Sequence, residues 1–174
     1  MAYEAIAATT LSSAQQTITF SSIPSTYEHL QLRCFTRLDI AVSVSAAFCI
    51  RFNNDSGTNY VEHRMIGDGS TASGTGSTSP GGTSIQFGIV TGATANANVF
   101  GVTICDILDY ASTNKYKTIR AITGNDNNGS GQTAETSGAW LSTSAINRID
   151  VGRLVSTITM VAGTVIALYG LKSA

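Results

Sequence analysis

Charged side chains are scarce in this chain of 174 residues. Lys, Arg, Asp and Glu make up 12% of the sequence and leave a net charge of −1, about half the charged share of an ordinary domain. Nucleic-acid binding needs a concentrated basic face that neutralises phosphates, and an electrostatic membrane anchor needs basic clusters. We therefore expect neither nucleic acid nor membrane as a partner.

Cysteine and histidine are also few. The three cysteines, Cys34, Cys49 and Cys105, are widely separated and lie in apolar runs, which predicts small buried side chains, a reducing site of synthesis and no metal site. The two histidines, His29 and His63, lie in strand-like segments, and no Gly-x-Ser-x-Gly motif is present. We expect surface or hydrogen-bonded histidines, no Ser-His-Asp site and no cofactor.

Long apolar runs are absent. None approaches the roughly 18 residues of a membrane span, and the first five residues lack the basic and apolar regions of a signal peptide. The length predicts one domain, 1–174, large enough to bury a hydrophobic core without disulfide bonds or bound metal to stabilise it. Low charge with 43% hydrophobic residues leaves a lone monomer poorly protected against self-association. Ser and Thr hydroxyls could keep that surface wet, but we favour a surface covered largely by partners.

Period-2 alternation of apolar and polar residues is what the chain does have, and it predicts β-strands. Leu30, Leu32 and Cys34 share one face of a segment whose other face carries Gln31 and Arg33. No long stretch keeps a helical apolar stripe, so we expect an all-β, two-sheet β-sandwich. The expected strands lie near 3–9, 16–21, 27–37, 46–54, 59–65, 84–91, 98–108, 115–123, 138–142, 145–153, 157–162 and 164–172.

The same alternation predicts which side chains fill the space between the sheets. The expected core residues are Leu30, Leu32, Phe48, Ile50, Phe52, Phe87, Val102, Ile104, Ile158 and Met160. The runs 98–108, 115–123 and 164–172 are apolar on both faces in places, which indicates central strands covered on both sides or a subunit contact.

Residues 67–83 form a low-complexity segment rich in Gly, Ser and Thr. It is not a phosphate-binding loop, because no Gly-Lys-Ser/Thr follows and it leads into a strand. Loops of this length are usually functional or disordered. Ordering it costs on the order of 1 kcal/mol or more per residue, so we expect contacts with another surface to hold it.

Chemistry-bearing residues form no convincing site. Asp106 and Asp109 could act as a glycosidase pair only if they faced each other across a cleft, and such a spacing more often caps a turn. The amide-rich loops at 53–55 and 125–128 lack the spacing of a calcium loop and favour turns by their own chemistry. A glycan site with Trp140 or Tyr60 as the stacking platform is the remaining alternative, against a core or interface role for Trp140.

Several blocks of the sequence resemble a group of tailed-phage and cyanophage virion structural proteins, often described as tail-fibre-like. The blocks are ITF at 18–20, IPSTYEHL at 23–30, RFNNDSGTNY at 51–60, ILDYASTNKYKT at 107–118, Trp140, AINRI at 145–149 and LYGLK at 168–172. The match spans nearly the whole chain. It implies an oligomeric β-sandwich on the virion surface without enzymatic activity, and for a small viral domain it favours a jelly roll of two four-stranded sheets.

The preferred function under this resemblance is a capsid decoration or cement protein. Neither an N-terminal anchor nor a repetitive shaft, as expected of a fibre, is present in the sequence. Because icosahedral shells offer three-fold positions, we expect a homotrimer bound to the phage major capsid protein. An N-terminal arm, 1–10, and the loop 67–83 would reach across subunit boundaries, and the candidate interface residues are Ala2, Tyr3, Glu4, Ser70, Thr71, Ser77 and Pro80.

The alternative function is a tail or fibre module that recognises a host surface glycan. Its candidate contacts are Tyr60, Trp140, Asn53 and Asp55. A surface depolymerase is a third hypothesis, which lacks a credible carboxylate pair. Copy number separates the first two hypotheses, because hundreds of copies per virion indicate the capsid and a few to tens indicate the tail.

Overall fold

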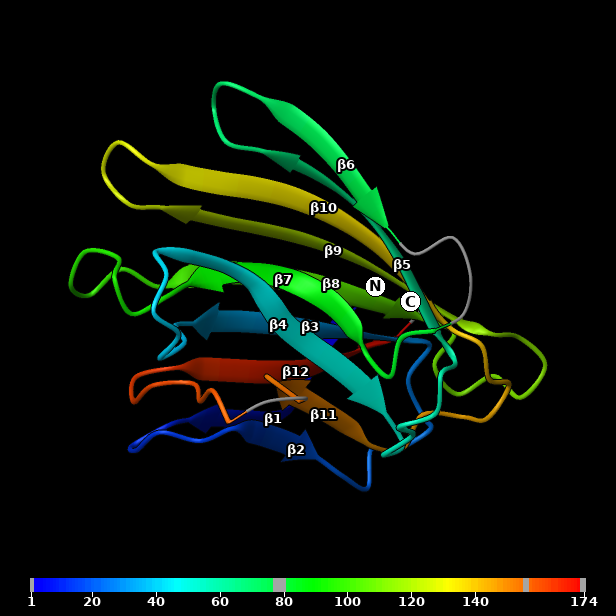
Figure 1. Ribbon diagram of the computed structural model, residues 1–174. Coiled ribbons are helices and arrows are strands. Elements are labelled where there is room, and N and C mark those ends of the chain that lie inside the picture. The colour runs from blue at the N-terminus through cyan, green and yellow to red at the C-terminus, as the bar shows by residue number, and fades with distance from the viewer. Residues whose placement is uncertain (1, 77–80, 155–156, 173–174) are drawn as a thin grey trace.

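Strands are the only regular elements in the computed structural model, which describes residues 2–76, 81–154 and 157–172 (Figure 1). No helix able to cross a membrane occurs among these residues. The strands are β1 (Ala2–Thr10), β2 (Thr17–Phe20), β3 (His29–Thr36), β4 (Val44–Phe52), β5 (Tyr60–Gly67), β6 (Ala72–Gly76), β7 (Ile85–Thr91), β8 (Gly101–Leu108), β9 (Lys117–Asp126), β10 (Gly131–Trp140), β11 (Ile149–Gly152) and β12 (Val165–Lys172).

Two antiparallel sheets pack face to face. The larger has the order β1-β12-β3-β8-β9-β10-β5-β6 and the smaller the order β2-β11-β4-β7. Without the pair β1–β12 and the hairpin β9–β10, the remaining strands follow the order of a jelly roll, with successive strands alternating between the sheets except for the hairpin β5–β6. The predicted jelly-roll-like sandwich is confirmed. The predicted four-plus-four division is wrong, because the two additional pairs enlarge one sheet to eight strands.

The hairpin β9–β10 follows from two residues at its tip. Asn128 and Gly129 have φ of 51° and 101°, the left-handed values that a two-residue hairpin turn needs to match strand twist. The strands pair in unbroken register from Asp126–Gly131 to Lys117–Trp140. The predicted segments 115–123 and 138–142 were too short, because the inward positions of β10 include small or polar residues, Ala134, Thr136 and Gly138.

The core lies between the sheets and contains seven of the ten predicted residues fully buried. These are Leu30, Leu32, Phe48, Ile50, Phe52, Phe87 and Met160. Ile158 is partly buried against the core. Val102 and Ile104 were wrong, because β8 turns Thr103 and Cys105 inward and leaves Val102 and Ile104 exposed. A one-residue error in phase moves a whole strand face from core to surface.

Two further expectations are settled by the fold. The predicted strand at 157–162 is not one, since Met160 makes only isolated bridges, to Gln15 and Leu38. The cysteines Cys34, Cys49 and Cys105 are buried and free, as predicted. Burial raises the pKa of all three thiols, which keeps them protonated and unreactive.

Candidate interaction surface

The four predicted glycan contacts lie together, but their rings are inside the molecule. Tyr60 and Trp140 are 1% and 2% exposed, with ring centroids 6.4 Å apart. Phe52 packs against the indole at 5.8 Å. Stacking on a sugar needs an open ring face, and neither ring offers one. These aromatic residues form part of the core instead.

The polar members of this set tie loops together. The indole N–H of Trp140 donates to Asp55 Oδ2 at 2.7 Å, and Asn59 Nδ2 donates to the same oxygen at 2.9 Å. These hydrogen bonds lower the pKa of Asp55. Asn53 donates through Nδ2 to the carbonyl of Ala145 at 2.8 Å. The cluster is therefore a structural clamp for the turn after β4.

The two histidines are not brought together, although His29 Nδ1 accepts from the backbone N–H of Asp109 at 3.1 Å. His29 and His63 lie on β3 and β5, separated by three strands, which places them roughly 19 Å apart. Asp106 accepts from Gln31 Nε2 at 2.8 Å. Asp109 pairs instead with Lys115 at 2.6 Å, which lowers the pKa of its carboxyl. Among the described residues, no group of three His, Cys, Asp or Glu side chains is arranged to hold a metal ion.

The predicted N-terminal arm is an edge strand of its own sheet. Ala2, Tyr3 and Glu4 are exposed, but β1 pairs along its length with β12. Glu4 also accepts from Lys172 Nζ at 2.9 Å. The expectation of an arm free to reach across a subunit boundary is therefore corrected, although the side chains remain accessible.

The predicted loop 67–83 is partly a hairpin. Residues 72–76 form β6, which pairs with β5, and Asp68 Oδ1 accepts from the backbone N–H of Ser70 at 2.9 Å and of Thr71 at 2.7 Å to close the turn. Ser77 and Pro80 lie outside the described residues. The sequence concealed this strand because β6 contains no large apolar residue. Much of the ordering cost is therefore offset within the chain.

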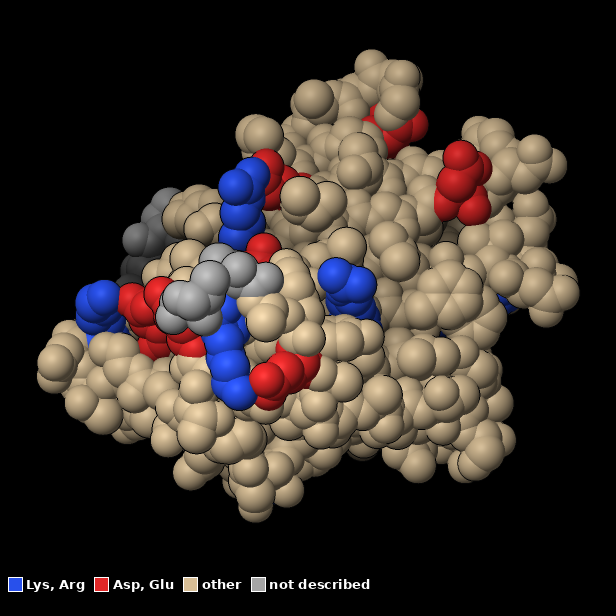
Figure 2. Space-filling view, turned by 180° about the vertical axis from the view of Figure 1, so that it is seen from behind, with Lys and Arg blue, Asp and Glu red and all other residues tan. Residues whose placement is uncertain are grey.

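Five exposed apolar side chains lie on the outer face of the eight-stranded sheet, interspersed with charged residues such as the exposed pair Arg120 and Glu135. We call the five together the outer apolar patch; its members, with their exposed fractions, are Phe35 45%, Met65 68%, Val102 48%, Ile104 42% and Ile122 56%. Phe35 lies opposite Val102, and Ile104 opposite Ile122. Figure 2 views the molecule from this side, where most charged side chains lie toward the left and two acidic groups stand at the upper right. The residues on both faces of 98–108 and 115–123 gave the sequence signal for this patch.

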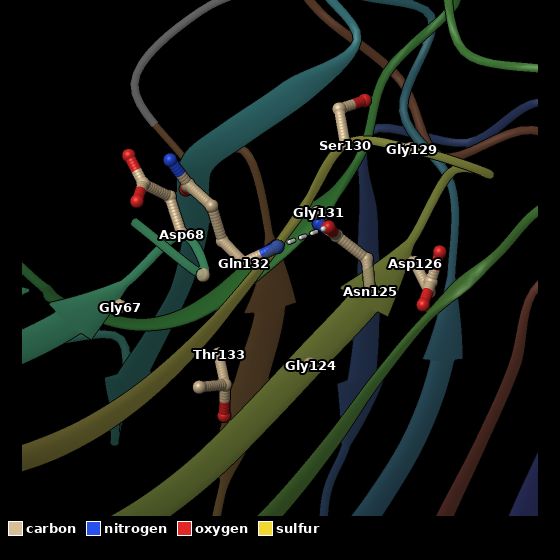
Figure 3. A pocket seen from close by; sticks show the side chains of 11 residues that line it. Gly67, Asp68, Gly124, Asn125, Asp126, Gly129, Ser130, Gly131, Gln132 and Thr133 are labelled. Carbon is tan, nitrogen blue, oxygen red and sulfur yellow. Dashed lines mark hydrogen bonds between the residues drawn. The ribbon is translucent and has the colours of Figure 1, made fainter. Parts of the chain in front are cut away.

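A trough borders the patch at the tips of the hairpins β5–β6 and β9–β10. Its first part, of about 570 Å³, has Gly67 and Gly124 in its floor and Asp68 and Asp126 at its rim (Figure 3). The second part, of about 500 Å³, includes Met65, Ile122 and Ala72 in its lining. A Cβ built on either floor glycine meets nothing nearer than 3.8 Å. Packing therefore does not require these glycines, and their lack of side chains leaves the trough open.

Comparison with protein-family models, curated proteins and solved structures finds no match to this chain. The site is therefore defined by its geometry: an apolar patch, an adjoining trough and a free strand edge on one sheet.

Proposed function

We propose that this chain is a non-enzymatic structural protein of a tailed-phage virion, a decoration or cement protein that binds the capsid as a homotrimer. The observation that supports it is the outer apolar patch, five large side chains from four strands left exposed on a sheet whose opposite face already forms the core. Apolar patches of this kind mark contact surfaces for other macromolecules.

The patch is energetically suited to a contact repeated many times. Burying the exposed halves of five large apolar side chains contributes about 4 to 8 kcal/mol. Association of one copy costs a comparable amount in lost translational and rotational freedom. A single contact is therefore weak, whereas three linked copies gain avidity without any new contact. This arithmetic favours an oligomeric clamp over a monomeric ligand.

The glycan-binding alternative is less well supported. Tyr60 and Trp140, the two aromatic platforms that it needs, are buried. No described feature replaces them with an exposed aromatic pair beside the Asn53 and Asp55 clamp. The depolymerase alternative is also less well supported, because Asp106 is bonded to Gln31 and Asp109 is paired with Lys115.

Counting copies in purified particles of the phage that encodes the chain tests the proposal. Quantitative mass spectrometry against the major capsid protein should find hundreds of copies per particle. A few to tens of copies would place the protein in the tail and overturn the decoration role.

A double variant tests the part played by the patch. Ile104→Thr with Ile122→Thr should reduce binding of added protein to undecorated particles by at least tenfold. Val42→Thr is the control, since Val42 is an exposed apolar residue outside the patch. Equal binding by all three proteins would remove the patch from the proposal.

A further inference from the structure

The free edge of β6 has backbone groups without partners. The turn bond from Asp68 N to Thr71 O, 3.2 Å, fixes which residues bond to β5, because hydrogen-bonded pairs alternate along an antiparallel ladder. By this alternation Ala72, Gly74 and Gly76 direct their N–H and C=O groups away from β5. No described residue pairs with that edge, and all five residues of β6 are exposed.

Edges of this type are normally protected against pairing by charges, bulges or proline. The opposite edge of the sheet has such protection: β1 contains a bulge between Ala5 and Ala7, and Glu4 is paired with Lys172. Strand β6 has no charge, no proline and no bulge. We propose that β6 is a docking edge, which extends the eight-stranded sheet by one strand contributed by an extended segment of a partner protein.

The surface beside the edge selects the side chains of that segment. Gly74 lies opposite Met65, so the sheet has no side chain between Met65 and a residue added next to Gly74. Those two residues would be roughly 10 Å apart. A large apolar side chain on the added strand would lie over Gly74 and contact Met65 and the trough. Alternate residues of the segment should therefore be apolar, as in other forms of strand addition.

Antiparallel pairing, which is slightly more stable per residue than parallel pairing, sets the direction of the segment, and charge sets the chemistry of one end. Asp68 and Asp126 stand at the rim of the trough, and their contacts are with Ser70, Thr71 and Asn128 rather than with any basic residue. A strand antiparallel to β6 runs toward the β5–β6 tip and places its C-terminal end beside Asp68, whereas Asp126 at the end of β9 is three strands farther away. The occupant is therefore an extended segment with alternate apolar residues and a basic residue near its C-terminal end. Only the origin of this segment, a shell protein, rests on the proposed function.

A labelled peptide tests the docking edge on the full chain. The probe is a fluorescein-labelled peptide of alternating valine and threonine, ending in two lysines, and binding is followed by fluorescence anisotropy. Gly74→Pro removes an outward N–H and leaves the bonds to β5 intact, since proline is tolerated at such edge positions. It should weaken binding at least tenfold, whereas Gly74→Ala, which keeps the N–H, should bind within about threefold of the original chain.

Charge and space are tested separately. Asp68→Asn keeps the turn acceptor and should weaken binding of the lysine peptide threefold or more, without affecting a peptide that ends in two serines. Gly67→Val should fill the trough and so weaken peptide binding. It should leave the thermal midpoint of unfolding unchanged or higher, because glycine weakens a strand.

Three results would overturn the inference. The first is that Gly74→Pro binds the peptide as well as the original chain does. The second is that Gly74→Ala loses as much peptide affinity as Gly74→Pro. The third is that the original chain does not bind the peptide and Gly74→Pro changes the oligomeric mass, which would make a second copy of the chain the occupant. The decoration role is tested independently, since a tail location found by copy counting would leave a positive peptide result in place.

Discussion

At the scale of single residues, an aromatic cluster of Phe52, Tyr60 and Trp140 lies below the β4–β5 turn. Phe52 is fully buried between Tyr60 and Trp140, and the polar atoms of both partners are hydrogen-bonded to the turn. The cluster therefore couples the core to the conformation of a surface loop.

Phe52→Ala should lower the free energy of unfolding by about 3 to 5 kcal/mol, because it removes a buried ring and leaves a cavity. Val102→Ala is the control for which residues of β8 point inward, since Val102 faces outward. It should lower the free energy of unfolding by under about 1 kcal/mol. Denaturant melts measure both values. A loss for Val102→Ala equal to that for Phe52→Ala would contradict the assigned phase of β8.

Asp55 makes the stability depend on acid. Its hydrogen bonds from Asn59 and Trp140 hold its pKa in the folded state below 3.8. The carboxylate therefore contributes stability that is fully present above pH 3.8 and is lost as the pH falls through the lowered pKa.

Asp55→Asn should be less stable than the original chain at pH 7, and the difference should shrink as the pH falls below 3.8. Urea melts between pH 7 and pH 2 measure this. A difference that stays constant over that range would show that the charge of Asp55 is not responsible.

At the scale of elements, Arg37 fixes the loop between β7 and β8. Its guanidinium donates to the carbonyls of Ala93, Ala95, Asn96 and Val99 at 2.7 to 3.1 Å. The planar fork of arginine suits this geometry, and an ammonium group does not. The loop in turn reaches the β9–β10 tip, which it supports.

Arg37→Lys should lower the free energy of unfolding by about 1 to 3 kcal/mol, because several backbone carbonyls that accept from the one guanidinium would lose their donor together. The matched control is Arg120→Lys, whose exposed pair with Glu135 is worth under about 1 kcal/mol. Thermal and denaturant melts measure stability, and limited proteolysis should show faster cleavage at 92–100. Equal effects of the two variants would exclude a special role for Arg37.

Elements differ in how well their sequences predicted them. Strands with large apolar residues at alternate positions, such as β3 and β4, were predicted because burial needs little more than that pattern. Strands β6 and β10 contain mainly Gly, Ser, Thr and Ala, so their order comes from pairing with neighbours, which a local pattern does not show. Asn128-Gly129 was the one local signal for the hairpin β9–β10.

The candidate site was predicted less well than the fold. The exposure of Trp140 and Tyr60 depends on which strand covers them, and a β-strand sequence with one aromatic residue does not contain that information. The only sequence signal for the outer apolar patch was the presence of apolar residues on both faces of β8 and β9. Its unpartnered state depends on sheet order, a long-range property.

At the scale of the whole molecule, one sheet has two unequal faces, a core and an exposed apolar surface, and one unprotected edge. We expect the isolated chain to form a homotrimer. Light scattering at micromolar concentration should give three times 18.1 kDa. A stable mass of 18.1 kDa for the original chain would contradict the trimer.

A cryo-EM map of the intact particle tests the central claim most directly. We expect hundreds of copies of this β-sandwich on the capsid, with the outer face of the eight-stranded sheet buried against protein. A map that places the domain only at the tail, or on the capsid with Ile104 and Ile122 facing solvent, would contradict it.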